Sequence, residues 1–403
     1  MHPAGGGAAL GIGKASVCDA EVKGRRVLVR ADLNVPLEDG KVADDTRIGA
    51  SLPTLELLLE GGASVVLVSH LGRPKDRDPK LSMAPVAARL DELLDAEVKL
   101  APAVVGDEVR SLAEKLEPGQ VLLLENSRYE PGETGDDPEL ADALASLADL
   151  YVNDAFGAAH RAHASTHGVA RRLPSCAGLL LEREVSELTK VRDHPEPPLV
   201  TVLGGAKVTD KIGVIERFLD RADEILIGGA MCFSFFKAEG RDTGDSLLDD
   251  ASVEAAREVL PRAKRAKARL HLPEDLVLGR ELSVNTEVQE LNGVDVPEGW
   301  MGLDIGSNTA AKYGKLVAGG GTVLWNGPMG AFELAPYAFG TRAVAEAVAN
   351  ASGHTVVGGG DSAAAMAEFG LADRVDWLST GGGASLELLE GAELPGVEAL
   401  NDA

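Results

Sequence analysis

The chain has 403 residues, of which 45% are hydrophobic, and it carries 39 lysine and arginine residues against 64 aspartate and glutamate residues. A chain of this length and apolar content predicts two hydrophobic cores and therefore two domains. The formal net charge of −25 repels nucleic acid and anionic membranes, so neither is an expected partner, and any phosphate site must be a local group of basic residues.

The expected cellular compartment and the cysteine content narrow the class of protein further. Neither a long apolar run nor a secretory signal layout is visible, so we expect the protein in the cytoplasm. Cys18, Cys176 and Cys232 are far apart and lack a CxxC spacing, which favours inert thiols over a disulfide framework or a zinc site. The acid excess is typical either of adaptation to high salt or of an ordinary acidic surface, and the sequence leaves both interpretations open.

Short apolar runs alternate with helix-like stretches along the chain. In the first half, buried parallel strands are predicted at 26–30, 64–68, 121–124 and 149–152. In the second half they are predicted at 199–203, 224–227, 322–325, 354–357 and 375–378. This alternation predicts an α/β fold in each half, with helices on both faces of a parallel sheet.

A helix is predicted to join the two halves. The stretch from Leu180 to Val191 has helical spacing of its apolar residues, and the proline-rich stretch 194–198 ends it. The predicted division is an N-terminal domain over 1–180, a joining helix over 181–194 and a C-terminal domain over 195–380.

Polar and basic residues follow the predicted strands of the first half. They lie in 30–34, 70–73, 125–128 and 153–163, and Arg47 adds another cation. Because parallel strands end at one edge of a sheet, these groups should converge there. Arginine binds phosphate and carboxylate groups through paired N–H donors, so a small anion is the predicted ligand. His160, His163 and His167 have a spacing that suits zinc on a helix, but the intervening Arg161 disfavours that alternative.

Glycine-rich stretches follow the predicted strands of the second half: GGAK (204–207), GGA (228–230), NGP (326–328), GGGDS (358–362) and GGGA (381–384). Glycine allows close backbone approach and leaves helix N-terminal N–H groups free for phosphate, so this edge predicts a nucleotide site. Lys207 and Lys211 can neutralise the phosphates. Asp361 is placed to hold Mg²⁺ on them, with an ordinary helix cap as its alternative role. The stretch from Gly7 to Ala15 imitates a P-loop but lacks its first glycine and its hydroxyl residue.

Taken together, the motifs of the chain resemble the phosphoglycerate kinase family from about Val22 onward. The motifs are RADLNVP (30–36), SHLGRP (69–74), LENSRY (124–129), NDAFG (153–157), LGGAK (203–207), WNGPMG (325–330) and STGGGA (379–384). The resemblance implies two Rossmann-like three-layer domains with substrates in the cleft between them. It also implies that the segment 381–403 returns to the N-terminal domain.

The resemblance also assigns roles to individual residues. It implies that 3-phosphoglycerate is held by Asp32, Asn34, Arg47, His70, Arg73, Arg128 and Arg161. It implies that the nucleotide is held by Lys207, Lys211, Gly302, Asn326, Glu333, Gly359, Gly360, Asp361 and Ser362, with Glu333 on the ribose and Asp361 on the metal.

The implied reaction is reversible phosphoryl transfer between 1,3-bisphosphoglycerate and ADP, giving 3-phosphoglycerate and ATP, in glycolysis and gluconeogenesis. We expect a monomer that uses Mg²⁺ with ATP or ADP, closes its domains, and stabilises the moving group through Arg47 and Lys207 without a general base. The alternatives are an inactive phosphometabolite sensor, which would be expected to lose Lys207 or Asp361, and an acetate-type kinase, for which so many arginines are excessive.

Overall fold

A computed structural model describes residues 12–403. The glycine-rich start of the chain, and with it the beginning of the P-loop-like stretch, lies outside the described residues. The chain forms two compact units, one made of residues up to Ser186 together with Glu393–Ala403, and the other made of Glu187–Ala392. Among residues 12–403, no helix is long and apolar enough to cross a membrane.

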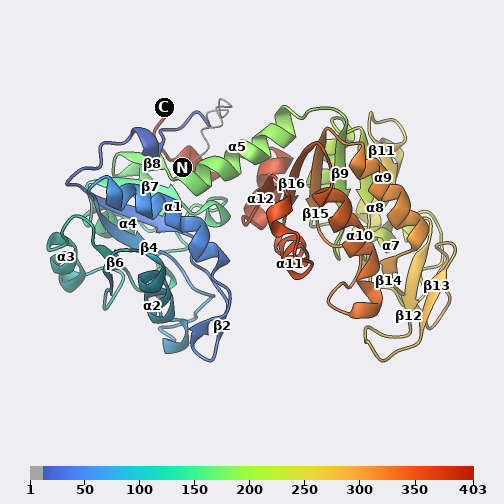
Figure 1. Cartoon of the computed structure of the whole chain (residues 1–403), viewed down its shortest axis with the longest axis horizontal. Helices are drawn as coiled ribbons and strands as arrows, with labels where there is room; N and C mark the ends of the chain where they lie inside the picture. Colours follow the sequence, from blue (N-terminus) through green and yellow to red (C-terminus); the bar gives the residue numbers. More distant parts are fainter. Residues whose placement is uncertain (1–11) are drawn as a thin grey trace. The chain divides into compact units, whose positions relative to one another are not determined.

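The first unit is built on a six-stranded parallel sheet with the order β5-β6-β4-β1-β7-β8. Figure 1 labels β4, β6, β7 and β8 of this sheet. Its strands are β1 (Arg26–Ala31), β4 (Ser64–Val68), β5 (Val98–Leu100), β6 (Val121–Leu123), β7 (Leu150–Asp154) and β8 (Ser175–Ala177). In the centre of the sheet, Val29 lies between Leu67 of β4 and Val152 of β7. Every residue of β4 and β7 is buried, as expected for strands covered on both faces.

Helices cover this sheet and complete the first core. They are α1 (Thr46–Glu60), α2 (Ala84–Leu93), α3 (Asp107–Glu114), α4 (Pro138–Ala145) and the short α13 (Pro395–Glu398), with a small hairpin of β2 (Leu37–Glu38) and β3 (Lys41–Val42). Capping residues mark the start of some of these helices. At α4, for example, the side chain of Asp137 accepts a hydrogen bond from the Leu140 N–H, and Pro138 occupies the first turn. Leu55 of α1, Leu90 of α2 and Val65 of β4 belong to the same buried hydrophobic core.

The second unit repeats the arrangement with a different strand order. Its parallel sheet runs β11-β10-β9-β15-β16-β17, and a separate antiparallel sheet runs β13-β12-β14. The strands are β9 (Leu199–Leu203), β10 (Glu224–Ile227), β11 (Arg269–His271), β12 (Leu276–Gly279), β13 (Val288–Leu291), β14 (Met301–Ile305), β15 (Thr322–Asn326), β16 (His354–Gly358) and β17 (Trp377–Leu378). The helices are α6 (Ile212–Leu219), α7 (Met231–Ala238), α8 (Asp250–Ala263), α9 (Ser307–Ala318), α10 (Phe339–Ala349), α11 (Gly360–Glu368) and α12 (Gly383–Glu390).

Both main sheets are parallel, which confirms the predicted α/β class. The edge strands β5, β8 and β11 and the whole antiparallel sheet were not predicted. The helix expected near Leu180 to Val191 is α5 (Leu179–Asp193), and the boundary between the units falls inside it.

The chain enters the first unit again later than the sequence predicted. The predicted segment starts at residue 381, but α12 belongs to the second unit, where a Cβ on Gly213 of α6 would lie 2.5 Å from the Glu390 side chain. Only Glu393–Ala403 joins the first unit. There Asn153 donates a hydrogen bond of 2.9 Å to the Gly396 carbonyl, and Lys14 lies 2.9 Å from Asp402.

Candidate functional site

The carboxyl ends of the strands in the first unit bring several of the predicted anion ligands together. Arg47, in the first turn of α1, forms an ion pair of 2.8 Å with Asp32, which follows β1. The second carboxylate oxygen of Asp32 is buried and accepts no hydrogen bond from residues 12–403. A buried acceptor without a donor is costly, so this oxygen is suited to accept a hydrogen bond from a ligand hydroxyl.

The turn after β4 is held from two sides by predicted ligands. Asn34 accepts a hydrogen bond of 2.8 Å from the N–H of Gly72, and Arg128 donates to the Gly72 carbonyl. Gly72 has φ +60 and its Cβ position is 3.0 Å from Leu81, so the turn requires glycine. These contacts orient the amide of Asn34 and the guanidinium of Arg128 at the same edge of the sheet.

The cations at this edge lie close enough to affect one another. Burial, and then the charges of Arg30, Arg73 and Arg161, lower the pKa of Arg128. Arg73 and Arg161 are exposed, and Arg161 donates to the ring of His160 at 3.0 Å. The structure thus gathers a cationic cluster in a chain whose formal net charge is −25, as a site for a small polyanion requires.

His70 lies buried within this cluster. Burial, followed by the charges of Arg30, Arg128, Arg47 and His163, lowers its pKa well below the ordinary histidine value. Its Nδ1 lies 3.0 Å from Nη2 of Arg30. The site predicted from the sequence did not include Arg30 as a ligand, although its position in the apolar run of β1 marks it as an unusual buried charge.

The alternative of a zinc site on three histidines is not supported by where they lie. His163 is the residue before a short helix at 164–168, His160 precedes that helix, and His167 pairs with Asp136 at 2.6 Å. They do not share one helical face. Among residues 12–403, no group of three or more histidine, cysteine or acidic side chains could hold a metal ion.

In the second unit, glycines allow two turns to meet at the point where the strand order reverses, between β9 and β15. Gly204 follows β9, and a Cβ there would lie 2.1 Å from the Pro328 carbonyl oxygen. Gly205 donates to the same oxygen at 3.0 Å. Ligands of open parallel sheets bind at such reversal points, which locates the candidate nucleotide site.

A cavity of about 290 Å³ opens beside these turns. It is lined by the predicted phosphate ligands Lys207, Lys211, Asn326, Gly359, Gly360, Asp361 and Ser362. The helix α11 starts here after Gly359, whose φ of +92 favours glycine, so its first N–H groups are available for an anion. The hydroxyl of Ser362 accepts a hydrogen bond of 2.6 Å from the Gly327 N–H and fixes the turn after β15.

Lys211 and Asn326 form a buried pair in this cavity. The ammonium of Lys211 donates to the side-chain oxygen of Asn326, and burial lowers the pKa of Lys211 to about 8 although Asp361 and Asp210 oppose the shift. The amide nitrogen of Asn326 is buried and has no hydrogen-bond acceptor among residues 12–403. Both side chains therefore have donor capacity left for a phosphate.

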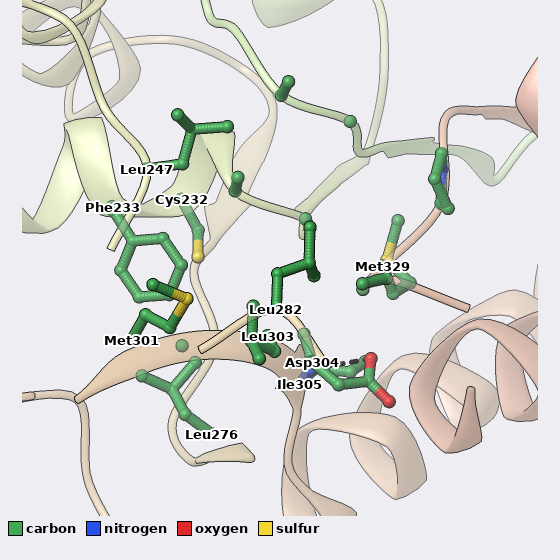
Figure 2. A pocket seen from close by; sticks show the side chains of 18 of the residues that line it. Cys232, Phe233, Leu247, Leu276, Leu282, Met301, Leu303, Asp304, Ile305 and Met329 are labelled. Carbon is green, nitrogen blue, oxygen red and sulfur yellow. Dashed lines mark hydrogen bonds between the residues drawn. The ribbon is translucent and has the colours of Figure 1, made fainter. Parts of the chain in front are cut away.

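A second cavity of about 430 Å³ shares Gly205, Ala206 and Asp361 with the first. Figure 2 shows its apolar side chains, among them Phe233 of α7, Leu276 of β12 and Met301 of β14. Gly302 is required in this wall, because a Cβ there would lie 2.1 Å from the Phe233 ring. Glu333 also lines the cavity. An apolar slot next to an anion site fits the base and sugar of a nucleotide.

The fold and the two candidate sites are those expected of a nucleotide-dependent phosphotransferase: one unit holds a cationic cluster suited to a small anion, and the other holds an apolar cavity beside a candidate phosphate site. Comparison with known proteins gives the family. The family model for phosphoglycerate kinase matches residues 17–392, and the chain therefore belongs to the phosphoglycerate kinase family.

Relatives along the full length agree with that family. The phosphoglycerate kinase of Roseiflexus castenholzii is 51% identical over 393 residues, covering 97% of this chain and 100% of the relative. That of Chloroflexus aurantiacus is 52% identical over 397 residues, with 97% and 99% covered. The structure of phosphoglycerate kinase from Coxiella burnetii superposes with a TM-score of 0.86 at 40% identity, covering 96% of this chain and 98% of that one.

A more distant solved structure shows the same fold. The phosphoglycerate kinase of Pyrococcus horikoshii has a TM-score of 0.81 at 33% identity, with 96% of this chain and 98% of that chain covered. The reaction of this chain is accordingly the reversible transfer of a phosphoryl group between 1,3-bisphosphoglycerate and ADP, giving 3-phosphoglycerate and ATP.

Proposed function

We propose that the cationic cluster of the first unit binds the phosphoglycerate through Asp32, Asn34, Arg47, His70, Arg73, Arg128 and Arg161. The observation that carries this proposal is the gathering of Arg30, Arg73 and Arg161 around Arg128 in a strongly acidic chain. Paired N–H donors of the arginines suit phosphate and carboxylate oxygens. The unsatisfied oxygen of Asp32 suits the substrate's hydroxyl.

The second unit binds the nucleotide through Lys207, Lys211, Gly302, Asn326, Glu333, Gly359, Gly360, Asp361 and Ser362. The base and sugar occupy the apolar cavity, and Glu333 accepts hydrogen bonds from the ribose hydroxyls. The phosphates meet Lys207, Lys211 and the first N–H groups of α11. Each assignment rests on the residues that line the two cavities.

Asp361 is the residue that would hold Mg²⁺. Mg²⁺ is commonly bound by one or two carboxylates together with substrate phosphates. Asp361 lines both cavities, and residues 12–403 contain no group of three metal-binding side chains. This donor set fits a cation that arrives with the nucleotide, where it would neutralise phosphate charge.

Transfer then depends on positioning and charge. An acyl phosphate is already activated, and the attacking oxygen in either direction is a carboxylate or phosphate oxygen, so the protein needs neither a covalent nucleophile nor a general base. Arg47 and Lys207 donate to the equatorial oxygens of the moving group as its charge spreads. A single chain carries both sets of residues, so we propose that a monomer is active, and that it works in the cytoplasm on intermediates of glycolysis.

The test is a coupled assay with 3-phosphoglycerate and ATP, with and without Mg²⁺. Replacing Arg47 or Lys207 by alanine is expected to lower kcat by about 10² to 10³, since donors to a transition state have effects of that size. Arg110→Ala and Lys315→Ala remove exposed cations of α3 and α9 and are the matched controls. Near-normal kcat with only a raised KM in either test variant would contradict its assigned role.

A further inference from the structure

We propose that Arg30 is a positioning residue: its guanidinium holds His70 as the neutral tautomer with the proton on Nε2, so that His70 presents an N–H donor to the phosphoglycerate. This inference rests on the proposed placement of the phosphoglycerate at the cationic cluster. It adds Arg30, which does not itself touch the substrate, to the proposed site. It also assigns a protonation state to His70, which does touch the substrate.

The tautomer follows from the chemistry of the contact. Arg30 lies at the end of β1 with 1% of its surface exposed, and its Nη2 is 3.0 Å from Nδ1 of His70. A guanidinium has five N–H donors and no acceptor, so the ring nitrogen that it contacts must offer a lone pair. Nδ1 of His70 is therefore unprotonated, and the single ring proton of the neutral imidazole is on Nε2.

A buried network fixes the guanidinium in place. Its Nε donates to the hydroxyl of Ser165 at 2.8 Å. That hydroxyl donates to Glu133 at 2.5 Å, and the N–H of Ser165 donates to the other oxygen of Glu133 at 3.1 Å. Glu133 also accepts from Ser127 and is 1% exposed. The carboxylate of Glu133, which balances the charge of Arg30, is linked to the guanidinium through the hydroxyl of Ser165. The Nη2 donor of Arg30 remains directed at His70.

The charges around His70 favour the same neutral form. Arg30 of β1, Arg47 of α1, Arg128 of the turn after β6, and His163 all lower the pKa of His70, after burial itself. The charge of Glu133 raises the pKa of Arg128 and of His163. The pKa of His163 nevertheless falls, chiefly because this side chain is buried. His70 therefore adds a hydrogen-bond donor to the site without adding a positive charge that would vary near neutral pH.

The direct test uses the wild-type protein labelled with ¹⁵N-histidine. At pH 7, we expect the His70 resonances to show an unprotonated Nδ1 and a protonated Nε2, with assignment from the His70→Gln spectrum. Either a protonated Nδ1 or an imidazolium at pH 7 would overturn the proposal. This measurement does not depend on activity, so it remains decisive even if the phosphoglycerate binds elsewhere.

The kinetic test asks whether Arg30 acts through His70. Arg30→Met removes the donor and one nearby cation, so the pKa of His70 should rise toward the ordinary value of about 6.5. The phosphate of 3-phosphoglycerate has a second pKa of about 6, so KM of the variant is compared with KM of the wild type at each pH. We expect the ratio of the two KM values to vary with pH between pH 5.5 and 7.5 and to reach roughly ten at pH 7.5, with a smaller change in kcat. Arg30→Lys retains a donor and should bring this ratio close to one across the range.

A double-mutant cycle separates positioning from a general loss of structure. In a His70→Ala background, Arg30→Met should change KM by less than about twofold, because the partner through which it acts is absent. Full additivity of the two substitutions would refute the proposal. Should Arg30→Met not fold, Ser165→Ala releases the guanidinium and is expected to give a weaker form of the same pH dependence. If His70→Ala alone leaves KM unchanged, the substrate assignment of His70 fails, while the resonance measurement still decides the tautomer.

Discussion

The buried ammonium of Lys211 predicts that nucleotide binding takes up a proton. In the free protein, its Nζ has only the oxygens of Asn326 as hydrogen-bond acceptors among the described residues, and burial lowers its pKa to about 8. Phosphate oxygens placed beside Nζ favour the charged form. In the complex, the pKa should return to the ordinary lysine value of about 10.4.

The sign and size of the effect follow by linkage. The complex binds the proton more tightly than the free protein, so the affinity is complete below about pH 8 and falls as the pH rises above it, by at most about tenfold per pH unit. At pH 9, one unit above the pKa of free Lys211, the dissociation constant should be roughly tenfold higher than at pH 7. The terminal phosphate of ADP, with a second pKa of about 6, is already about nine-tenths ionised at pH 7 and adds little slope of its own.

Isothermal titration calorimetry of ADP binding at pH 7.0, 8.0 and 9.0, with Mg²⁺ held constant, measures this directly. Repeating the titrations in two buffers of different ionisation enthalpy counts the protons taken up, which should approach one per nucleotide at pH 9. Lys211→Met should bind ADP more weakly at every pH and show no slope, whereas Lys315→Met on the exposed face of α9 should behave like the wild type. A wild-type affinity that is constant from pH 7 to 9, or an equal slope in Lys211→Met, would refute the reasoning.

Three further outcomes are expected. Gly204→Ala puts a Cβ 2.1 Å from the Pro328 carbonyl oxygen and should lower the melting temperature by about 5 °C. Gly314→Ala, within α9, would place a Cβ 3.8 Å from Ala347 of α10 and should not lower it, and equal losses in the two variants would contradict this. If the charge of −25 reflects adaptation to high salt, activity and melting temperature should rise as KCl increases from dilute to molar, and a flat melting temperature would exclude that origin. Burial raises the pKa of Asp304 to about 8, so the folded state holds this proton more tightly and the free energy of unfolding falls as pH rises from about 4 to 8. Urea titrations at pH 5 and 7.5 should show a smaller fall in the free energy of unfolding for Asp304→Asn than for the wild type. Identical falls in the two proteins would contradict this prediction.

The proximity of the candidate anion ligands could be predicted because a parallel sheet ends all its strands at one edge. Asp32, His70 and Arg128 follow three strands that are neighbours in the sheet, so their local sequence positions already imply proximity. The role of Arg30 could not be predicted in this way. Its partners are Ser165, in the short helix 164–168, and Glu133, in a turn, and both lie more than one hundred residues away, so nothing in the local pattern of β1 pairs them.

Elements that depend on distant contacts or on edges were also missed. β13 is largely exposed and carries Gln289 and Glu290, so it lacks the apolar run that indicates a strand. β5 is an edge strand with an exposed Lys99 at its centre. The position of α12 depends on the close approach of Glu390 to Gly213, and such a contact is invisible to local periodicity.

The pairing of residues 13–15 with the returning segment has a consequence for biosynthesis. Ala15 donates to the carbonyl of Asn401 at 2.9 Å, and the Asn401 side chain accepts from the N–H of Ser175 at 2.7 Å. On the ribosome, Glu393–Ala403 emerges only after all of Glu187–Ala392 has been made. Domains ordinarily complete their folding in the order in which they are synthesised. Here the first unit begins to emerge first but receives Glu393–Ala403 only after the second unit has been translated, so it is completed after the second unit.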